Sequence, residues 1–89
     1  MSSPVVSLNR AVAVAMADGP NSGLRILDQL ESGGELNDYH LFHAARADLL
    51  RREGSLAEAT QSYKRALELV TNDSERKFLE KRLKEVESQ

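Results

Sequence analysis

The stretch Tyr39–Val70, YHLFHAARADLLRREGSLAEATQSYKRALELV, decides the fold of this chain. Its apolar and small residues recur every three or four positions in both halves, which is the spacing of one face of an α-helix. Between the halves, Gly54 suits the left-handed residue that ends a helix, and Ser55 with Glu58 suits a capping box that begins the next one. The stretch therefore predicts two antiparallel helices joined by a tight turn. The apolar and small positions are Leu41, Ala44, Ala45, Leu49, Leu50, Leu56, Ala59, Tyr63, Ala66, Leu67 and Val70.

Similar patterns predict two helices before this stretch and one helix after it. Ser3 and Pro4 are a typical N-cap and first helical residue. Gly19 and Pro20 end one helix and begin another. We expect a single domain over residues 1–89. Its parts are a helix pair over 4–32, a second pair over 38–71 capped by Asn37 or Asp38, and a final helix over 73–87 capped by Asn72 or Asp73.

An internal repeat links these helices. A shift of 36 residues aligns Arg10, Arg46 and Arg82, and it aligns Gly23 with Ala59. Gly23 is therefore predicted to lie at a contact that requires a small side chain. Two roles remain open for the three arginines, a structural ion pair in each repeat or a ladder that grips an acidic partner. The offset predicts an all-α, tetratricopeptide-like right-handed array of two antiparallel helix pairs, closed by a C-terminal capping helix.

Composition excludes several classes of protein. The 89 residues carry 12 basic and 14 acidic side chains, a net charge of −2, so no strongly basic nucleic-acid surface is expected. The chain has no cysteine, which excludes disulfides and thiolate sites and agrees with a reducing, cytoplasmic location. No apolar run reaches the roughly 18 residues of a membrane span, so no membrane association is expected.

The two histidines are the only candidates for a metal site. His40 and His43 lie three residues apart on one predicted helix, with Asp38 or Asp48 nearby. Two histidines make an incomplete site, and the alternative is a packing or surface role. Neither a catalytic constellation nor a phosphate-binding glycine motif occurs in the sequence. We therefore expect neither an enzyme nor a cofactor.

The concave side of such an array is lined by the first helix of each pair. This surface changes from apolar to basic along the array, which suits an amphipathic or acidic helix of a partner. The alternatives are that a preceding segment or a second copy covers its apolar part. We expect Leu8→Glu to spare the fold and to weaken partner binding. The candidate partner-binding residues are Val5, Leu8, Asn9, Val12, Met16, Leu41, Ala45, Asp48, Arg51, Arg52, Lys77, Lys81 and Lys84.

Several long phrases occur in an order that resembles a known family. They are SPVVSLNRAVAVAMADGP, YHLFHAARADLLRREG, AEA followed by SYKRALEL, and ERKFLEKRL. Together they resemble the C-terminal tetratricopeptide-like domain of bacterial extracytoplasmic-function (ECF) RNA polymerase sigma factors. In that family the promoter-reading regions lie N-terminal to this domain. The resemblance thus implies a segment of a longer sigma factor, with Met1 as an added start.

The resemblance also implies a function and partners. It implies a regulatory protein-protein interaction domain in transcription initiation, without direct binding of nucleic acid by this segment. The implied partners are the sigma core regions in cis, RNA polymerase, or both. The alternative is a free-standing tetratricopeptide-like adaptor that binds a peptide. A chaperone-type carboxylate clamp is not expected, because Leu8, Val12 and Ala45 occupy positions where that clamp needs Lys or Asn.

Overall fold

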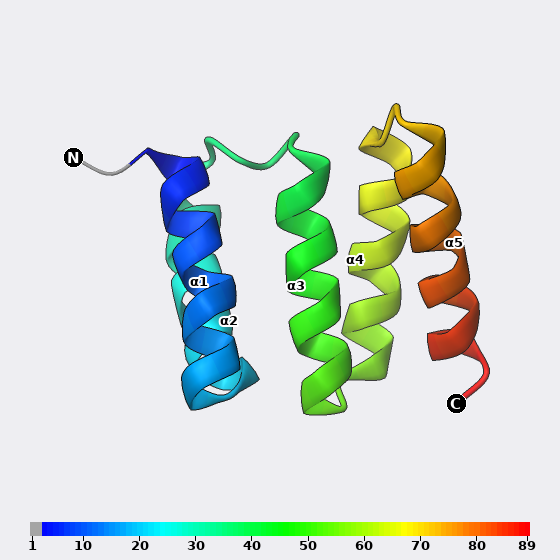
Figure 1. Ribbon diagram of the computed structural model, residues 1–89, viewed down its shortest axis with the longest axis horizontal. Coiled ribbons are helices and arrows are strands. Elements are labelled where there is room, and N and C mark those ends of the chain that lie inside the picture. Colours follow the sequence, from blue (N-terminus) through cyan, green and yellow to red (C-terminus); the bar gives the residue numbers. More distant parts are fainter. Residues whose placement is uncertain (1–2) are drawn as a thin grey trace.

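The computed structural model describes residues 3–89, so the expectation about Met1 lies outside the described residues. The described part contains five α-helices and no strand, which confirms the all-α class. The helices are α1 (Pro4–Asp18), α2 (Pro20–Gly33), α3 (His40–Glu53), α4 (Leu56–Leu69) and α5 (Asp73–Glu87) (Figure 1).

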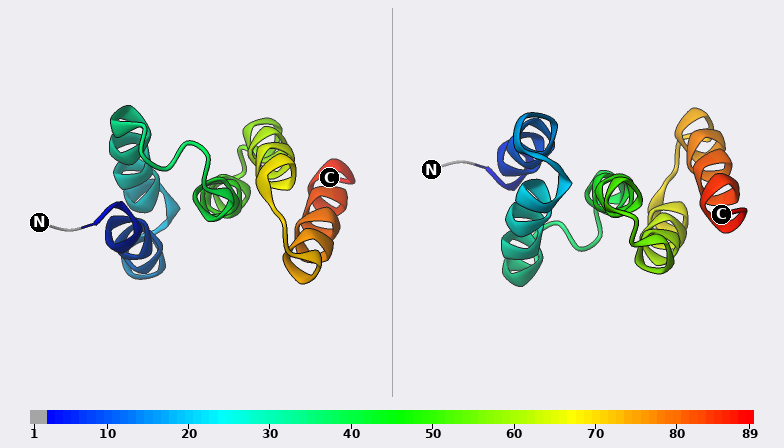
Figure 2. Two further views of the ribbon diagram at one scale, coloured as in Figure 1. Left: turned by 90° about the horizontal axis from the view of Figure 1, so that it is seen from above. Right: turned by 90° about the horizontal axis from the view of Figure 1, so that it is seen from below.

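The helices pack in chain order. The strongest contacts join α1 to α2 and α3 to α4, and further contacts join α2 to α3 and α4 to α5. Successive helices alternate in direction, so α1, α3 and α5 all run the same way (Figure 1). The end-on views in Figure 2 show the elements following one another across the molecule, with the chain ends at opposite sides. This is the arrangement of two antiparallel pairs and a terminal helix.

The turn between α3 and α4 forms as its glycine predicts. Gly54 adopts the left-handed conformation (φ 95°, ψ 4°), and its N–H donates to the carbonyls of Leu50 and Arg51. The predicted capping box is wrong. Ser55 precedes α4, but its side chain makes no capping hydrogen bond.

The start of α3 also differs from the prediction. Asn37 and Asp38 do not cap the helix, which begins at His40 after Tyr39. The physical reason is a turn over residues 35–38 that buries Leu36. The N–H of Tyr39 donates to the carbonyl of Leu36 at 3.0 Å and closes this turn. Burial of Leu36 thus holds the two polar residues outside the helix.

The first and last helices have side-chain caps. The Ser3 hydroxyl accepts from the N–H of Val6 at 3.2 Å. The Asn72 side-chain oxygen accepts from the N–H of Glu75 at 3.0 Å. Both caps agree with the sequence.

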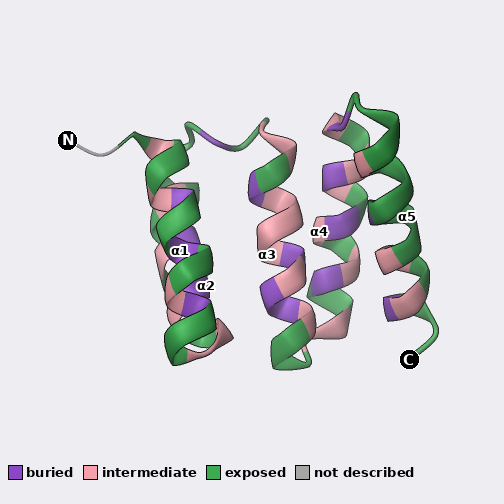
Figure 3. Cartoon of the chain, viewed as in Figure 1, coloured by how far each residue is buried: buried purple, intermediate pink, exposed green. Residues whose placement is uncertain are grey.

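A continuous core runs between the helices, and its buried residues line their facing sides (Figure 3). Tyr63, Phe42, Leu27 and Leu49 are the largest side chains in it that are fully buried. Gly23 is buried where α1 and α3 both approach α2. A Cβ atom there would lie 2.7 Å from the carbonyl oxygen of Ala11 and 2.9 Å from Cδ1 of Leu49. The predicted small-residue contact at Gly23 is confirmed.

Candidate protein-binding groove

A groove of about 420 Å³ lies on the side of the array where α1, α3 and α5 face one another. Because these three helices run in the same direction, equivalent turns of each lie at the same end of the groove. Its lining combines apolar side chains from all three helices with a few polar ones. The lining residues are Val5, Leu8, Asn9, Val12, Tyr39, Leu41, Ala44, Ala45, Asp48, Arg52, Tyr63, Phe78, Leu79 and Arg82.

The apolar wall of the groove is open to solvent. Val5, Val12, Leu41 and Phe78 are 43%, 37%, 40% and 55% exposed. Six large hydrophobic residues are exposed in the described part of the chain, and these four line the groove. Exposed apolar side chains that gather in one hollow are typical of a binding surface, whereas scattered ones are not.

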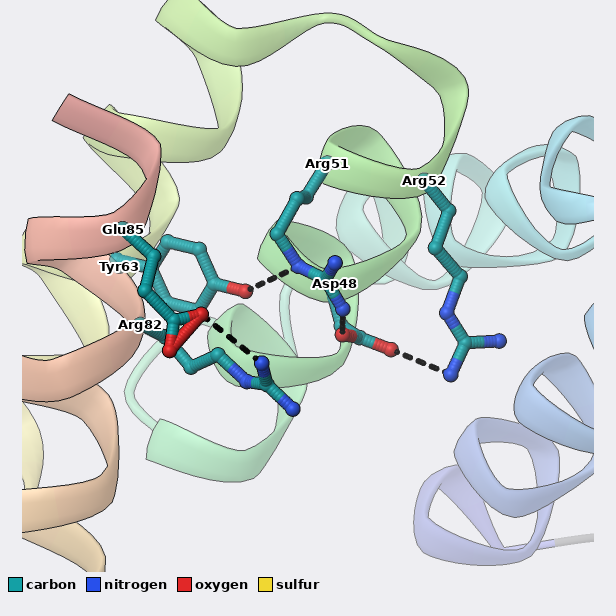
Figure 4. Close-up of polar contacts among 6 residues, drawn as sticks. All are labelled: Asp48, Arg51, Arg52, Tyr63, Arg82 and Glu85. Carbon is teal, nitrogen blue, oxygen red and sulfur yellow. Dashed lines mark hydrogen bonds and ion pairs between the residues drawn. The ribbon is translucent and has the colours of Figure 1, made fainter. Parts of the chain in front are cut away.

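A polar cluster closes one end of this wall (Figure 4). The carboxylate of Asp48 accepts from Arg51 Nη2 at 2.5 Å and pairs with Arg52 Nη2 at 3.1 Å. Both arginines lie one turn further along α3, at the i+3 and i+4 positions that share a helix face. Nε of Arg51 also donates to the Tyr63 hydroxyl at 3.3 Å, which ties α3 to α4.

The α5 side of the groove contributes a third guanidinium. Nη1 of Arg82 donates to Glu85 at 3.1 Å. The same guanidinium lies over the ring of Phe78, 5.1 Å from its centroid, in a cation–π arrangement. Nε of Arg82 is buried and has no hydrogen-bond partner among residues 3–89.

Two groups of this cluster have shifted pKa values. Burial raises the pKa of the Tyr63 hydroxyl, and the hydrogen bond from Arg51 opposes this only in part. The hydrogen bond to Asp48 raises the pKa of Arg51. At neutral pH the cluster therefore holds a neutral phenol and a fully charged guanidinium.

Eight of the thirteen residues predicted for the concave face line the groove. They are Val5, Leu8, Asn9, Val12, Leu41, Ala45, Asp48 and Arg52. Leu8 is only 4% exposed, however, and belongs to the core. The expectation that Leu8→Glu spares the fold is therefore wrong, because the substitution would bury a charge.

The other five predicted residues lie elsewhere. Met16 is 73% exposed but does not line the groove, and Arg51 pairs with Asp48 without lining the groove itself. Lys77, Lys81 and Lys84 line a separate shallow hollow on α5 together with Glu80 and Glu85. The prediction that these three lysines face the groove is thus corrected.

The sequence reasoning missed six lining residues, Tyr39, Ala44, Tyr63, Phe78, Leu79 and Arg82. The spacing of Phe78 and Arg82 was an available signal, since residues four apart share a helix face. On α5 they replace the lysines as the groove-facing side chains.

The three aligned arginines do not form a ladder. Arg46 pairs with Asp28 at 2.9 Å and Glu31 at 3.1 Å, and so joins α3 to α2. Arg82 lines the groove, whereas Arg10 is exposed and has no ion pair with another described residue. Arg46 therefore has the first of the two predicted roles, a structural ion pair.

The two histidines point to different neighbours. His40 Nε2 contacts the carboxylate of Glu75, which links α3 to α5 beside the groove. His43 Nε2 lies 2.7 Å from the backbone oxygen of Asn37. Across residues 3–89, no three side chains of His, Asp or Glu are grouped so that they could hold a metal ion.

Comparison with known proteins finds a similar segment in a longer protein. The chain is 41% identical over 81 residues to a protein of Rhizobium meliloti (strain 1021) that is named only as uncharacterized. The match covers 91% of this chain but 19% of the relative, so the chain spans about a fifth of the relative's length. The chain matches no protein-family model and no solved structure. Within residues 3–89, none of the helices has the length and apolar character needed to cross a membrane.

Proposed function

We propose that this chain is a protein-protein interaction domain that acts as the C-terminal regulatory domain of an ECF-type sigma factor in the bacterial cytoplasm. The observation that carries the proposal is the groove between α1, α3 and α5. Its wall exposes apolar side chains from three helices and ends in a cluster of guanidinium groups. Helical arrays commonly bind partners on such surfaces, because their first helices form a continuous concave face.

Two further observations support this function. The phrases of the sequence that resemble ECF sigma factors cover nearly the whole chain, from Ser3 to Leu83. The Rhizobium meliloti protein carries a similar segment within a chain about five times longer, which agrees with a domain that regulates other regions of the same polypeptide. The proposed partners are the sigma core regions in cis, RNA polymerase, or both.

The test is a titration of the ¹⁵N-labelled chain with the sigma core regions of the parent protein, and separately with core RNA polymerase. We expect shifts at Val12, Leu41 and Phe78 with at least one of them. Leu41→Ser should weaken binding, because it removes an exposed apolar contact. Met16→Ser is the matched control, since Met16 is exposed but does not line the groove.

The outcomes separate the two candidate roles. Shifts with the sigma core indicate regulation in cis, and shifts with polymerase alone indicate docking. No response to either protein, together with saturable binding of an unrelated peptide in the groove, would replace the sigma-factor role by that of a free-standing adaptor.

A further inference from the structure

The polar end of the groove carries more positive than negative charge. Arg51, Arg52 and Arg82 surround the carboxylates of Asp48 and Glu85 (Figure 4). Three guanidinium groups thus share two carboxylates. The groove keeps a local positive excess although the chain as a whole has a net charge of −2.

Two of the three arginines line the groove and have donors that no other residue within 3–89 uses. Arg51 donates through two of its nitrogens, to Asp48 and to Tyr63, and does not line the groove. Arg52 makes one ion pair through Nη2, and its side chain is 45% exposed. Arg82 contacts Glu85 through Nη1 alone, and its side chain is 33% exposed. Arg52 and Arg82 can therefore accept a further anionic group.

The groove also has a direction. Leu41 is the second residue of α3 and Val5 the second of α1, so these two exposed apolar side chains lie at the N-terminal ends of their helices. Val12 and Phe78 lie further along α1 and α5. Arg52 lies in the last turn of α3, at the opposite end. A ligand that spans the groove meets apolar surface first and guanidinium groups second.

We propose that the occupant of this groove is an amphipathic α-helix of the protein partner that carries an acidic residue at one end. Its apolar stripe lies on Val5, Leu41 and Phe78, and its carboxylate binds Arg52 and Arg82. This inference rests on the proposed function and names the chemistry of the partner. Charge complementarity selects the acid, and the all-helical walls favour a helix in a groove over strand addition, since residues 3–89 contain no sheet edge.

The length of the groove limits the occupant. On α3 the lining runs from Leu41 to Arg52, a rise of roughly 16 Å at about 1.5 Å per residue. A helix of about three turns therefore spans the stretch of α3 that lines the groove. The expected pattern is a stripe of two or three apolar residues three or four positions apart, with Asp or Glu about one turn beyond it.

The test uses a phage-displayed library of random peptides, selected on the 89-residue chain, followed by synthetic copies of the enriched peptides. We expect enriched sequences to combine the apolar stripe with an acidic residue at a constant offset. Replacing that acid by its amide should weaken binding about tenfold or more, because a charge-assisted hydrogen bond is lost. The double variant Arg52→Gln/Arg82→Gln should weaken binding of the acidic peptide by a similar factor.

The matched control removes the same charge outside the groove. Lys81→Gln/Lys84→Gln also deletes two positive charges, but from the separate hollow on α5. It should leave the affinity nearly unchanged, and thermal melting should show that both double variants fold. Enriched peptides that bind without an acid, or that respond equally to both double variants, would overturn the inference and leave the proposed function standing. Failure of every peptide, and of the sigma core and polymerase, to bind the groove would overturn both.

Discussion

At the scale of single residues, Gly23 shows how closely the helices approach one another. A glycine inside a helix costs about 1 kcal/mol relative to alanine. Here the missing Cβ would lie 2.7 Å from the carbonyl oxygen of Ala11, 2.7 Å from Cβ of Ala15 and 2.9 Å from Cδ1 of Leu49. Two of these atoms belong to α1 and one to α3, so a side chain would push both neighbours away from α2.

We predict that Gly23→Ala lowers the free energy of unfolding by about 1–3 kcal/mol, because overpacking outweighs the gain in helix propensity. Gly33→Ala is the control. Gly33 ends the same helix, and a Cβ there meets no atom within 4 Å, so we expect a gain of about 0.4–1 kcal/mol. Urea unfolding followed by circular dichroism measures both changes. Stabilisation of the protein by both substitutions would contradict the close approach at Gly23.

Tyr63 gives a prediction for alkaline pH. Its side chain is 1% exposed, and burial raises its pKa above the ordinary value of 10.0. The folded protein therefore holds this proton more tightly than the unfolded chain. The resulting stability is fully present below pH 10 and is lost as the pH rises through the raised pKa.

Tyr63→Phe should remove this contribution, so the variant should lose less stability than the wild type on titration above pH 10. At pH 7 it should lose about 0.5–1.5 kcal/mol with the hydrogen bond to Arg51. Denaturant unfolding at several pH values measures both effects, and Tyr39→Phe serves as the control. If the stabilities of the Tyr63→Phe variant and of the wild type decline equally above pH 10, the raised pKa of Tyr63 is contradicted.

At the scale of helices, side-chain capping distinguishes the starts of α4 and α5, which resemble each other in sequence. Asn72 accepts a hydrogen bond from the N–H of Glu75, whereas the Ser55 side chain accepts none. The Asn72 cap matters for the groove because it begins α5, which supplies Phe78 and Arg82.

We predict that Asn72→Ala lowers the free energy of unfolding by about 1 kcal/mol, the usual loss for a side-chain cap. Ser55→Ala should change it by a few tenths of a kcal/mol, since no capping bond is removed. Thermal unfolding of the two variants compares them directly. A larger loss for Ser55→Ala would show that the capping box forms in solution.

At the scale of the whole molecule, the helices form a one-dimensional stack in which each contacts chiefly its neighbours in sequence. In such arrays stability comes from each unit and from its interfaces with adjacent units. The central helices have an interface on both sides, whereas α5 packs chiefly on α4. Four residues of α3 are buried, compared with two in α5.

We therefore predict that amide hydrogen exchange is slowest in α3 and α4 and faster in α5. Leu49, Leu50 and Tyr63 should be among the most protected residues, because opening them requires disruption of the central interface. Exchange measured by NMR at several denaturant concentrations tests this order. Protection of α5 equal to that of α3 would indicate that the array unfolds as one cooperative unit.

Features that depend only on neighbouring residues in the chain could be predicted from the sequence. Helix starts at Pro4 and Pro20, the left-handed Gly54 and a cap at Asn72 or Asp73 all follow from local geometry, and the structure places the cap at Asn72. The repeat offset also identified Gly23 as a helix contact, since equivalent positions of a repeat meet equivalent neighbours. These features need no knowledge of where distant helices lie.

Which side chains reach the groove depends instead on how the helices pack. Successive residues of a helix are rotated by about 100°, so the buried Leu79 leaves two flanks of α5 available to solvent or to a neighbour. The packing of α5 on α4 turns Phe78 and Arg82 toward α1 and α3, and it turns Lys77 and Lys81 away. Leu8 was assigned to the open surface for the same reason, because its helix is apolar on most of its circumference and periodicity does not tell which side is covered. The rotation of each helix about its own axis depends on contacts between distant residues, and local sequence does not contain it.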